Sequence, residues 1–332
     1  MTANSIGFKG KMRIPKGAHT IFSFSLPYAI PVPDGIYKVR LGGYITEISL
    51  RRVQKQQVEG WEASGRAFLQ IAFDKYGRSS FSIIEMKIPR TLDLFETGRI
   101  PLLLGDIPPR NGAKETVLRF LNRFIETARY VTEEFWVEPA RYQDMLSYKV
   151  FYWDGKKRYP AMVSLIDTGI GGFALSSGHP FQIESGKMKE LRKVLENESE
   201  LSVDKVLILN AKDACLQEDF RLAIIEAVTA LEMVLYSFIR RQGNELKIPK
   251  ENLERFIIDV GLTGNILVVL KMLTKGFEQI DMDTLRKCKG AIKTRNKILH
   301  EGFRNVTSTD TEERIIAIGK MIAYLNRLMA TI

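Results

Sequence analysis

The stretch of residues 281–304, DMDTLRKCKGAIKTRNKILHEGFR, decides the fold of the C-terminal part of the chain. One series of positions in it alternates spacings of three and four: Leu285, Cys288, Ile292, Arg295 and Leu299. All of them except Arg295 are apolar, and this period is typical of a helix that turns one seam toward a core. Gly302 follows where a glycine commonly ends a helix. We therefore predict a helix over residues 281–299 that packs into a helical bundle.

The same period continues through most of the last third of the chain. It predicts further helices over residues 214–241, 250–260, 265–274 and 311–329. Glu312 and Glu313 are expected in the first turn of the last helix, where the helix dipole favours acids. Strand patterns are almost absent here, so residues 201–332 are expected to form an all-α bundle.

The first two thirds of the chain have a different pattern. Short β-branched and aromatic runs predict strands over residues 20–25, 35–41, 44–50, 68–73, 80–88, 147–153 and 161–166. Helices are expected over residues 114–130 and 187–195. The pattern therefore predicts that residues 1–200 form an α+β domain, with mixed or antiparallel strands and one long helix. The polar, acidic stretch over residues 196–204 is the predicted domain boundary.

Composition limits the classes of protein that the chain can belong to. It has 332 residues, a net charge of +10, two cysteines and three histidines. Cys215 and Cys288 are expected as core residues of a reduced, cytoplasmic protein, and neither a metal site nor a cofactor is expected. No apolar run approaches the roughly 18–20 residues that span a bilayer, so no membrane contact is expected. The positive charge favours polyanionic partners such as RNA.

The most informative constellation lies at the end of the helix over residues 281–299. Arg295 interrupts the apolar seam, and an unpaired buried charge is costly, so it needs solvent, a partner acid or a bound anion. Glu226 and Glu232 are the candidate acids. Asn296 and His300 lie four residues apart and share one face. His300 is about 140° around the helix axis from Arg295. A polar notch of Arg295, Asn296 and His300 is therefore expected.

Such a notch suits phosphodiester chemistry. The planar fork of Arg295 can hold a phosphate, and a histidine such as His300 can move protons near neutral pH. RNA carries its own nucleophile, the 2′-hydroxyl, so no metal ion is required. Four neighbouring cations are candidates for binding the RNA: Lys289, Lys293, Lys297 and Arg304. The alternative is structural, with His300 favoured by the helix dipole and Arg295 paired to Glu226 or Glu232.

The stretch Arg295-Asn296-Lys297-Ile298-Leu299-His300 resembles the Arg-x4–6-His motif of HEPN domains. Residues 207–211, LILNA, together with 221–227, RLAIIEA, and 230–232, ALE, resemble the opening helix of HEPN proteins from prokaryotic defence systems. The resemblance covers residues 201–332 and nothing before them. It implies a bundle of four or five helices that forms a homodimer, in which two copies of the motif meet at a composite site.

The resemblance also implies an activity. Active HEPN members are metal-independent endoribonucleases, often in toxin–antitoxin or antiviral defence systems, so an antitoxin or a phage-derived trigger is a possible partner. By position, Arg295 would bind the phosphate, His300 would be the general acid or base, and Asn296 would orient one of them. Other members are non-catalytic modules that dimerise or bind RNA or a partner protein. A third reading is a scaffold in which Arg295 serves only a salt bridge.

Other signals favour ordinary structural roles. Asp167-Thr168-Gly169 resembles the aspartic protease motif but occurs once, whereas those enzymes need two such carboxylates. The glycines over residues 169–172 lack the spacing of a dinucleotide loop, and no P-loop pattern occurs. Trp61, Trp136 and Trp153 can stack on bases, although core packing is the expected role. The basic run of Lys9, Lys11, Arg13 and Lys16 is expected to be a solvated surface.

Overall fold

The computed structural model divides the chain into two compact units, Met1–Glu200 and Leu201–Ile332, and each is considered by itself. The structure describes residues 19–59, 68–71, 80–88, 111–163, 173–177, 181–274 and 280–331. The basic run over residues 9–16, Trp61 and the Asp167-Thr168-Gly169 stretch therefore lie outside the described residues. The glycines over residues 169–172 do so as well.

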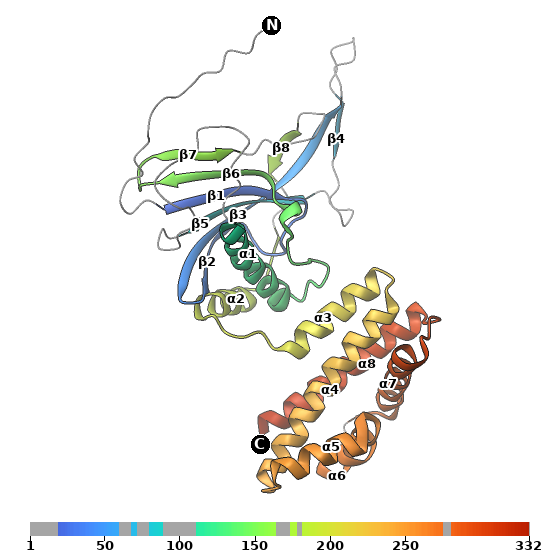
Figure 1. Ribbon diagram of the computed structural model, residues 1–332. Coiled ribbons are helices and arrows are strands. Elements are labelled where there is room, and N and C mark those ends of the chain that lie inside the picture. The colour runs from blue at the N-terminus through green and yellow to red at the C-terminus, as the bar shows by residue number, and fades with distance from the viewer. Residues whose placement is uncertain are drawn as a thin grey trace. The chain divides into compact units, whose positions relative to one another are not determined.

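The first unit is built on one antiparallel sheet (Figure 1). In the described residues it has eight strands: β1 (His19–Leu26), β2 (Gly35–Leu41), β3 (Tyr44–Glu59), β4 (Phe68–Ile71), β5 (Ser80–Ile88), β6 (Leu146–Trp153), β7 (Arg158–Val163) and β8 (Phe173–Ser177). The main order is β2-β3-β5-β1-β6-β7, and the far half of the long strand β3 pairs with β4 and β8. Strand β1, the first in the described chain, therefore lies in the middle of the sheet.

Helix α1 (Asn111–Thr132) covers one face of this sheet, beside α2 (Ser185–Asn197). Alternate strand residues such as Phe22, Tyr37 and Ile84 are buried against it. The Tyr37 and Phe124 rings lie 4.9 Å apart between their centroids. Because side chains alternate along a strand, the intervening residues lie on the opposite face of the sheet. A short 3-10 turn, η1 (Tyr142–Asp144), precedes β6.

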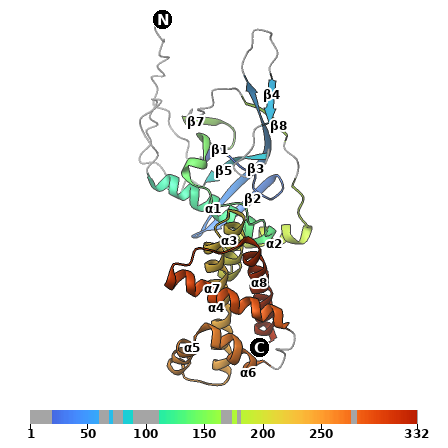
Figure 2. The same cartoon turned by 90° about the vertical axis from the view of Figure 1, so that its right-hand side faces the viewer.

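The second unit is helical. Its elements are α3 (Val203–Leu216), α4 (Phe220–Glu245), α5 (Lys250–Gly264), the π-helical turn η2 (Asn265–Val269), α6 (Leu270–Leu273), α7 (Met282–Glu301) and α8 (Ser308–Thr331). Helix α4 is central, because it packs against α3, α8, α7 and α5 (Figure 2). Eleven of its residues are buried, which gives the unit a continuous apolar core.

The expected fold class is confirmed at the level of an antiparallel α+β part followed by a helical part. Two strand predictions extend beyond the described residues, namely 72–73 and 164–166. Strand β8 was not predicted, because the sequence FALSS is short and carries no clear alternation.

The prediction of one helix over residues 214–241 is wrong, because two helices meet there. Helix α3 begins at Val203, inside the polar stretch predicted as the domain boundary, and ends at Leu216. The chain turns at Glu218, whose φ of 63° is left-handed, and Asp219 then caps α4 by accepting a hydrogen bond from the Leu222 amide. The apolar pattern runs through both helices, so periodicity alone does not reveal the turn.

Helix α7 is held by its ends and by α8. The Asp281 carboxylate accepts hydrogen bonds from the Thr284 amide and hydroxyl at 2.7 and 2.8 Å, which caps the first turn. The Arg314 guanidinium of α8 donates to the Thr294 hydroxyl at 2.9 Å. Helix α8 begins at Ser308, so Asp310 rather than Glu312 or Glu313 occupies its first turn. These contacts fix the rotation of α7 about its own axis.

The expected apolar seam of α7 is correct over its first half and wrong at its end. Leu285, Cys288 and Ile292 are buried as predicted, but Leu299 is 50% exposed and Ile298 takes its place in the core. At 100° per residue Leu299 lies only about 40° around the axis from Leu285, so the helical period does not account for its exposure. The exposure depends on which neighbouring segments cover the last turn of α7, and that is a property of the packing.

Two helical stretches are long and apolar enough to cross a membrane by length and composition, contrary to the expectation from the sequence. They are Phe220–Glu245, which is α4, and Lys250–Leu273, which spans α5 to α6. This is weak support for a membrane span, because the core helix of a globular unit meets the same criteria. Helix α4 is such a core helix.

The end of α7 gives a stability prediction. Gly302 has a φ of 66°, in the left-handed region that disfavours side chains, whereas Gly319 lies inside α8 with open space at the Cβ position. Gly302→Ala should lower the free energy of unfolding by about 1 kcal/mol. Gly319→Ala should raise it by up to about 1 kcal/mol, because alanine favours a helix interior. Urea unfolding followed by circular dichroism measures both, and equal shifts would contradict this account.

Candidate functional site

Arg295 lies in the middle of the buried face of α7. Its neighbours on that face are apolar and buried, among them Cys288, Ala291 and Ile298. The guanidinium is paired across the bundle with α4, where its Nη2 atom lies 3.5 Å from a carboxylate oxygen of Glu232. Both side chains are only about one quarter exposed, at 27% and 28%. The charge of Arg295 is therefore compensated by one of the two acids named from the sequence.

The other end of the guanidinium reaches the exposed side of α7. Its Nη1 atom donates a hydrogen bond of 3.2 Å to the Asn296 side-chain oxygen. Asn296 is exposed, and the exposed His300 lies four residues later on the same helical face. Arg295 itself is about 140° around the axis from His300. The Arg295 head thus connects Glu232 in the bundle with the face that carries Asn296 and His300.

The Arg295 fork is not saturated. Within the described residues, its buried Nε–H has no hydrogen-bond partner, and its contact with Glu232 is longer than a strong charge-assisted hydrogen bond. A buried guanidinium donor without an acceptor is costly and calls for an explanation. The Nε atom is enclosed, so an external phosphate would meet the Nη side of the fork, next to Asn296.

Two residues that the sequence analysis did not single out belong to this site. Tyr236 lies one turn after Glu232 on α4, and Asn265 is fully buried in the π-helical turn η2. Burial first, and then the charge and hydrogen bonding of Glu232, raise the pKa of Tyr236 to about 12, while Asn265 and Arg295 act in the opposite direction. The Asn265 amide also donates to the Ile257 carbonyl at 2.9 Å.

Tyr236 hydrogen-bonds with Glu232, and Asn265 hydrogen-bonds with Tyr236. The spacing of Glu232 and Tyr236 could have indicated a shared helical face, but nothing local to Asn265 indicates its role. The π-helical turn that buries Asn265 is a feature of three-dimensional packing. Such turns occur frequently at functional sites.

Glu226 has a different environment. It lies on the same helix as Glu232, six residues earlier, but it interacts with Asn210 of α3 instead of an arginine. One of its carboxylate oxygens is buried without a hydrogen-bond partner among the described residues. Burial raises the pKa of Glu226, and the hydrogen bond with Asn210 opposes that shift. Of the two candidate acids, Glu232 is the one that contacts Arg295.

The cations expected to bind RNA lie on or beside the exposed side of α7. Lys289, Lys293 and Arg304 are exposed, whereas Lys297 is partly buried with its ammonium 5.6 Å from the centre of the Phe303 ring. Lys289 also lines an open groove of about 520 Å³ with Arg286, Met282, Leu285 and Leu267. Lys289, Lys293, Asn296 and His300 follow one another at spacings of four, three and four, so they form a single exposed stripe.

The cysteines and tryptophans named from the sequence differ in burial. Cys288 is buried, and burial raises the pKa of its thiol to about 12, which keeps it protonated and unreactive near neutral pH. Cys215 is a partly buried free thiol. Trp136 is buried in the core of the first unit, as expected, but Trp153 is only partly buried. Among the residues that the structure describes, no group of His, Cys, Asp and Glu side chains is arranged to hold a metal ion.

Comparisons with protein-family models, with curated proteins and with solved structures find no match for this chain.

The two acids of α4 provide a matched stability test. Glu232→Gln removes the countercharge of a partly buried guanidinium, so the free energy of unfolding should fall by about 1–2 kcal/mol. Glu226→Gln keeps the shape and removes a carboxylate whose charge is disfavoured, so stability should be equal or higher. Urea unfolding of both variants near neutral pH measures the difference. Equal losses in the two variants would show that the Arg295–Glu232 pair contributes nothing specific.

The stability of the Glu226→Gln variant should also depend on pH in a defined way. Because the folded state raises the pKa of Glu226, it holds this proton more tightly than the unfolded chain does. Its contribution to stability is therefore present at acidic pH and is lost as the pH rises through the raised folded value. The stability of Glu226→Gln relative to the wild type should increase from about pH 4 to about pH 7. A constant difference over this range would contradict the shift.

Proposed function

We propose that the C-terminal unit is a HEPN-type bundle that cleaves RNA without a metal ion, through Arg295, Asn296 and His300. The observation that carries the proposal is the connection from Glu232 through Arg295 to Asn296, on the exposed stripe that also holds His300 and two lysines. This connection brings a guanidinium, an amide and an imidazole to one surface. The excess of positive charge along the stripe suits a phosphate backbone.

The chemistry follows from these groups. The RNA 2′-hydroxyl attacks the adjacent phosphorus while the bond to the 5′-oxygen of the next nucleotide breaks. The products are a 2′,3′-cyclic phosphate and a 5′-hydroxyl end. His300 removes the 2′-hydroxyl proton or supplies one to the leaving oxygen. Arg295 stabilises the negative charge on the phosphoryl oxygens through the Nη side of its fork, which reaches the exposed side of α7, and Asn296 orients the guanidinium.

One copy of the chain carries only one His300, whereas the reaction uses both a base and an acid. A homodimer with its two α7 stripes facing each other would supply both, which agrees with what the family resemblance implies. The proposed setting is a cytoplasmic defence or toxin effector, in which an antitoxin or a phage-derived trigger controls access to the site.

The second candidate is a non-catalytic module that binds RNA or a partner protein. It is favoured by the separation of Arg295 and His300 around α7, and it needs only the exposed stripe. The Arg295–Glu232 pair alone also suits a purely structural role. The hydrogen bond from Arg295 Nη1 to the exposed Asn296 favours the proposed site over a salt bridge alone, because it brings the guanidinium to the edge of the exposed stripe.

Cleavage of a mixed pool of single-stranded and structured RNAs in EDTA tests the proposal. The wild type should generate cyclic-phosphate ends, and His300→Ala should reduce the rate by about 10²- to 10⁴-fold with the fold retained. Arg295→Lys keeps the charge but loses the planar fork, so it should also lose most activity. It is the safer variant, because Arg295→Ala leaves Glu232 unpaired. Full cleavage by folded His300→Ala would remove this residue from the mechanism.

RNA binding separates the two candidates. Lys293→Glu should weaken binding and make the slope of log Kd against log salt about one to two shallower, because Lys293 lies on the stripe. Lys320→Glu makes the same charge change at an exposed position of α8 and serves as the control. Salt-sensitive binding through Lys293 without cleavage by the wild type would support the non-catalytic module. Equal effects of the two variants would remove the stripe from RNA binding.

A further inference from the structure

The sheet face opposite α1 carries an unusual set of side chains. Strand β6 has Val150 in the core, so Lys149, Phe151 and Trp153 lie on the opposite face. Phe151 and Trp153 are partly exposed, although aromatic residues of this size are normally buried in a sheet core. The Trp153 ring lies opposite His19 of β1, with 6.1 Å between the ring centroids.

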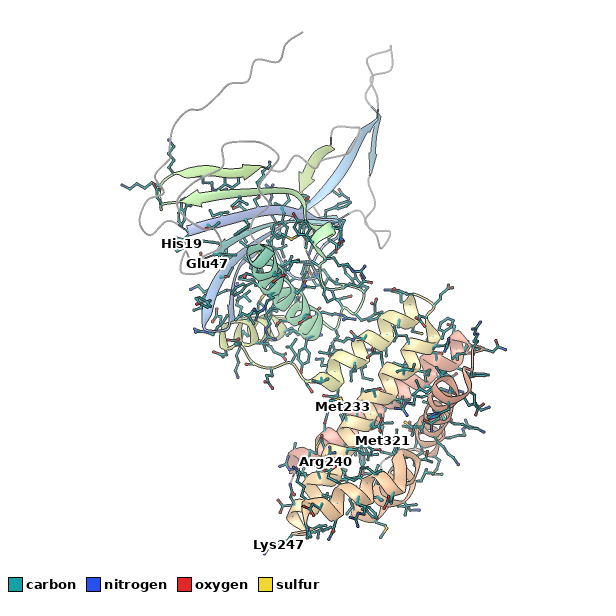
Figure 3. The ribbon with its side chains drawn as sticks, viewed as in Figure 1. His19, Glu47, Met233, Arg240, Lys247 and Met321 are labelled. Carbon is teal, nitrogen blue, oxygen red and sulfur yellow. The ribbon has the colours of Figure 1, made fainter. Side chains whose placement is uncertain are left out.

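The register places cations around these rings. Lys87 of β5 lies 4.5 Å above the Trp153 ring and 3.4 Å from the Glu47 carboxylate of β3. Figure 3 shows His19 and Glu47 at neighbouring points of the sheet. Arg158 pairs with Trp153 across β6 and β7, and its guanidinium holds the Glu85 carboxylate through two hydrogen bonds of 2.8 and 3.0 Å. The Trp153 ring thus lies among charged groups.

The charge on this face is predominantly positive. Within the described strands β1, β2, β3, β5, β6 and β7, its two acids, Glu47 and Glu85, are both paired with cations. Three further cations are exposed and have no hydrogen bond or ion pair in the part of the chain that the structure describes: Lys38, Arg51 and Lys149. The face therefore presents aromatic rings together with unpaired positive charges.

We propose that this face of the sheet binds single-stranded nucleic acid. Bases stack on aromatic rings whatever their sequence, and the unpaired cations contact the phosphates. A sheet face is suited to a single strand because alternate residues place rings and cations at regular intervals along one surface. A folded protein partner would instead match a face with few charged groups. The proposal concerns Phe151, Trp153 and their surrounding cations, and it does not depend on cleavage by the C-terminal unit.

The test uses the full-length chain with His300→Ala and Lys293→Glu in every sample, so that cleavage is removed and binding through the α7 stripe is weakened equally in all of them. Fluorescence anisotropy measures the binding of a labelled single-stranded RNA of mixed sequence. In this background Trp153→Leu should weaken binding at least about fivefold. Lys149→Glu, made separately, should also weaken binding, and its effect on the Kd should be larger at low salt than at high salt. Lys193→Glu makes the same charge change on α2, on the covered side of the sheet, and should have little effect.

Trp153→Phe provides a second, local readout. It keeps a ring for stacking, so binding should be largely retained, but the quenching of tryptophan fluorescence on RNA addition should be lost. A single-stranded DNA of the same sequence should bind if the bases and phosphates suffice, and RNA alone should bind if the 2′-hydroxyl is read. The proposal is overturned if Trp153→Leu and Lys149→Glu, both folded by circular dichroism, bind RNA as tightly as Lys193→Glu. The proposal is also overturned if the His300→Ala, Lys293→Glu background variant binds double-stranded but not single-stranded nucleic acid.

Discussion

The cost of burying the Arg295 charge constrains the C-terminal unit more than any other single interaction. A guanidinium in the middle of an apolar helix face requires a countercharge, and Glu232 of the central helix α4 supplies it at 3.5 Å. That pairing restricts how α7 can rotate and slide against α4. It also places the head of Arg295 beside Asn296, so one electrostatic requirement links the packing of the bundle to its exposed stripe.

The hydrogen bonds around the Arg295–Glu232 pair extend to the π-helical turn η2, which follows α5. Tyr236 hydrogen-bonds with Glu232 and with Asn265, and Asn265 is fully buried in a π-helical turn. A distortion of this kind costs regular helical hydrogen bonds and is kept where it places a side chain that a regular helix could not. The position of Arg295 is therefore set by several helices, which is the property expected of a site that must hold its geometry.

In the first unit, the two faces of the sheet differ in character. Its sheet buries one face against α1, and the alternation of side chains then leaves the other face polar and aromatic. The sequence alone marks Trp136 and Trp153 as equivalent, yet Trp136 is buried in the core and Trp153 lies on the opposite face of the sheet, near His19 and Lys87. The sequence could not separate them, because Trp136 lies in the turn after α1 and packs into the core, whereas the face on which Trp153 lies depends on strand register.

The sequence by itself determined features that depend on local pattern: most of the strands and helices, the end of α7 at Gly302, and the shared face of Asn296 and His300. Tertiary structure decided which acid meets Arg295, that Ile298 replaces Leu299 in the core, and that a left-handed turn at Glu218 divides α3 from α4. The physical reason is the sequence separation over which each interaction acts. Periodicity and capping act within a few residues, whereas ion pairs and burial depend on segments that are distant in sequence and are set by how the helices pack.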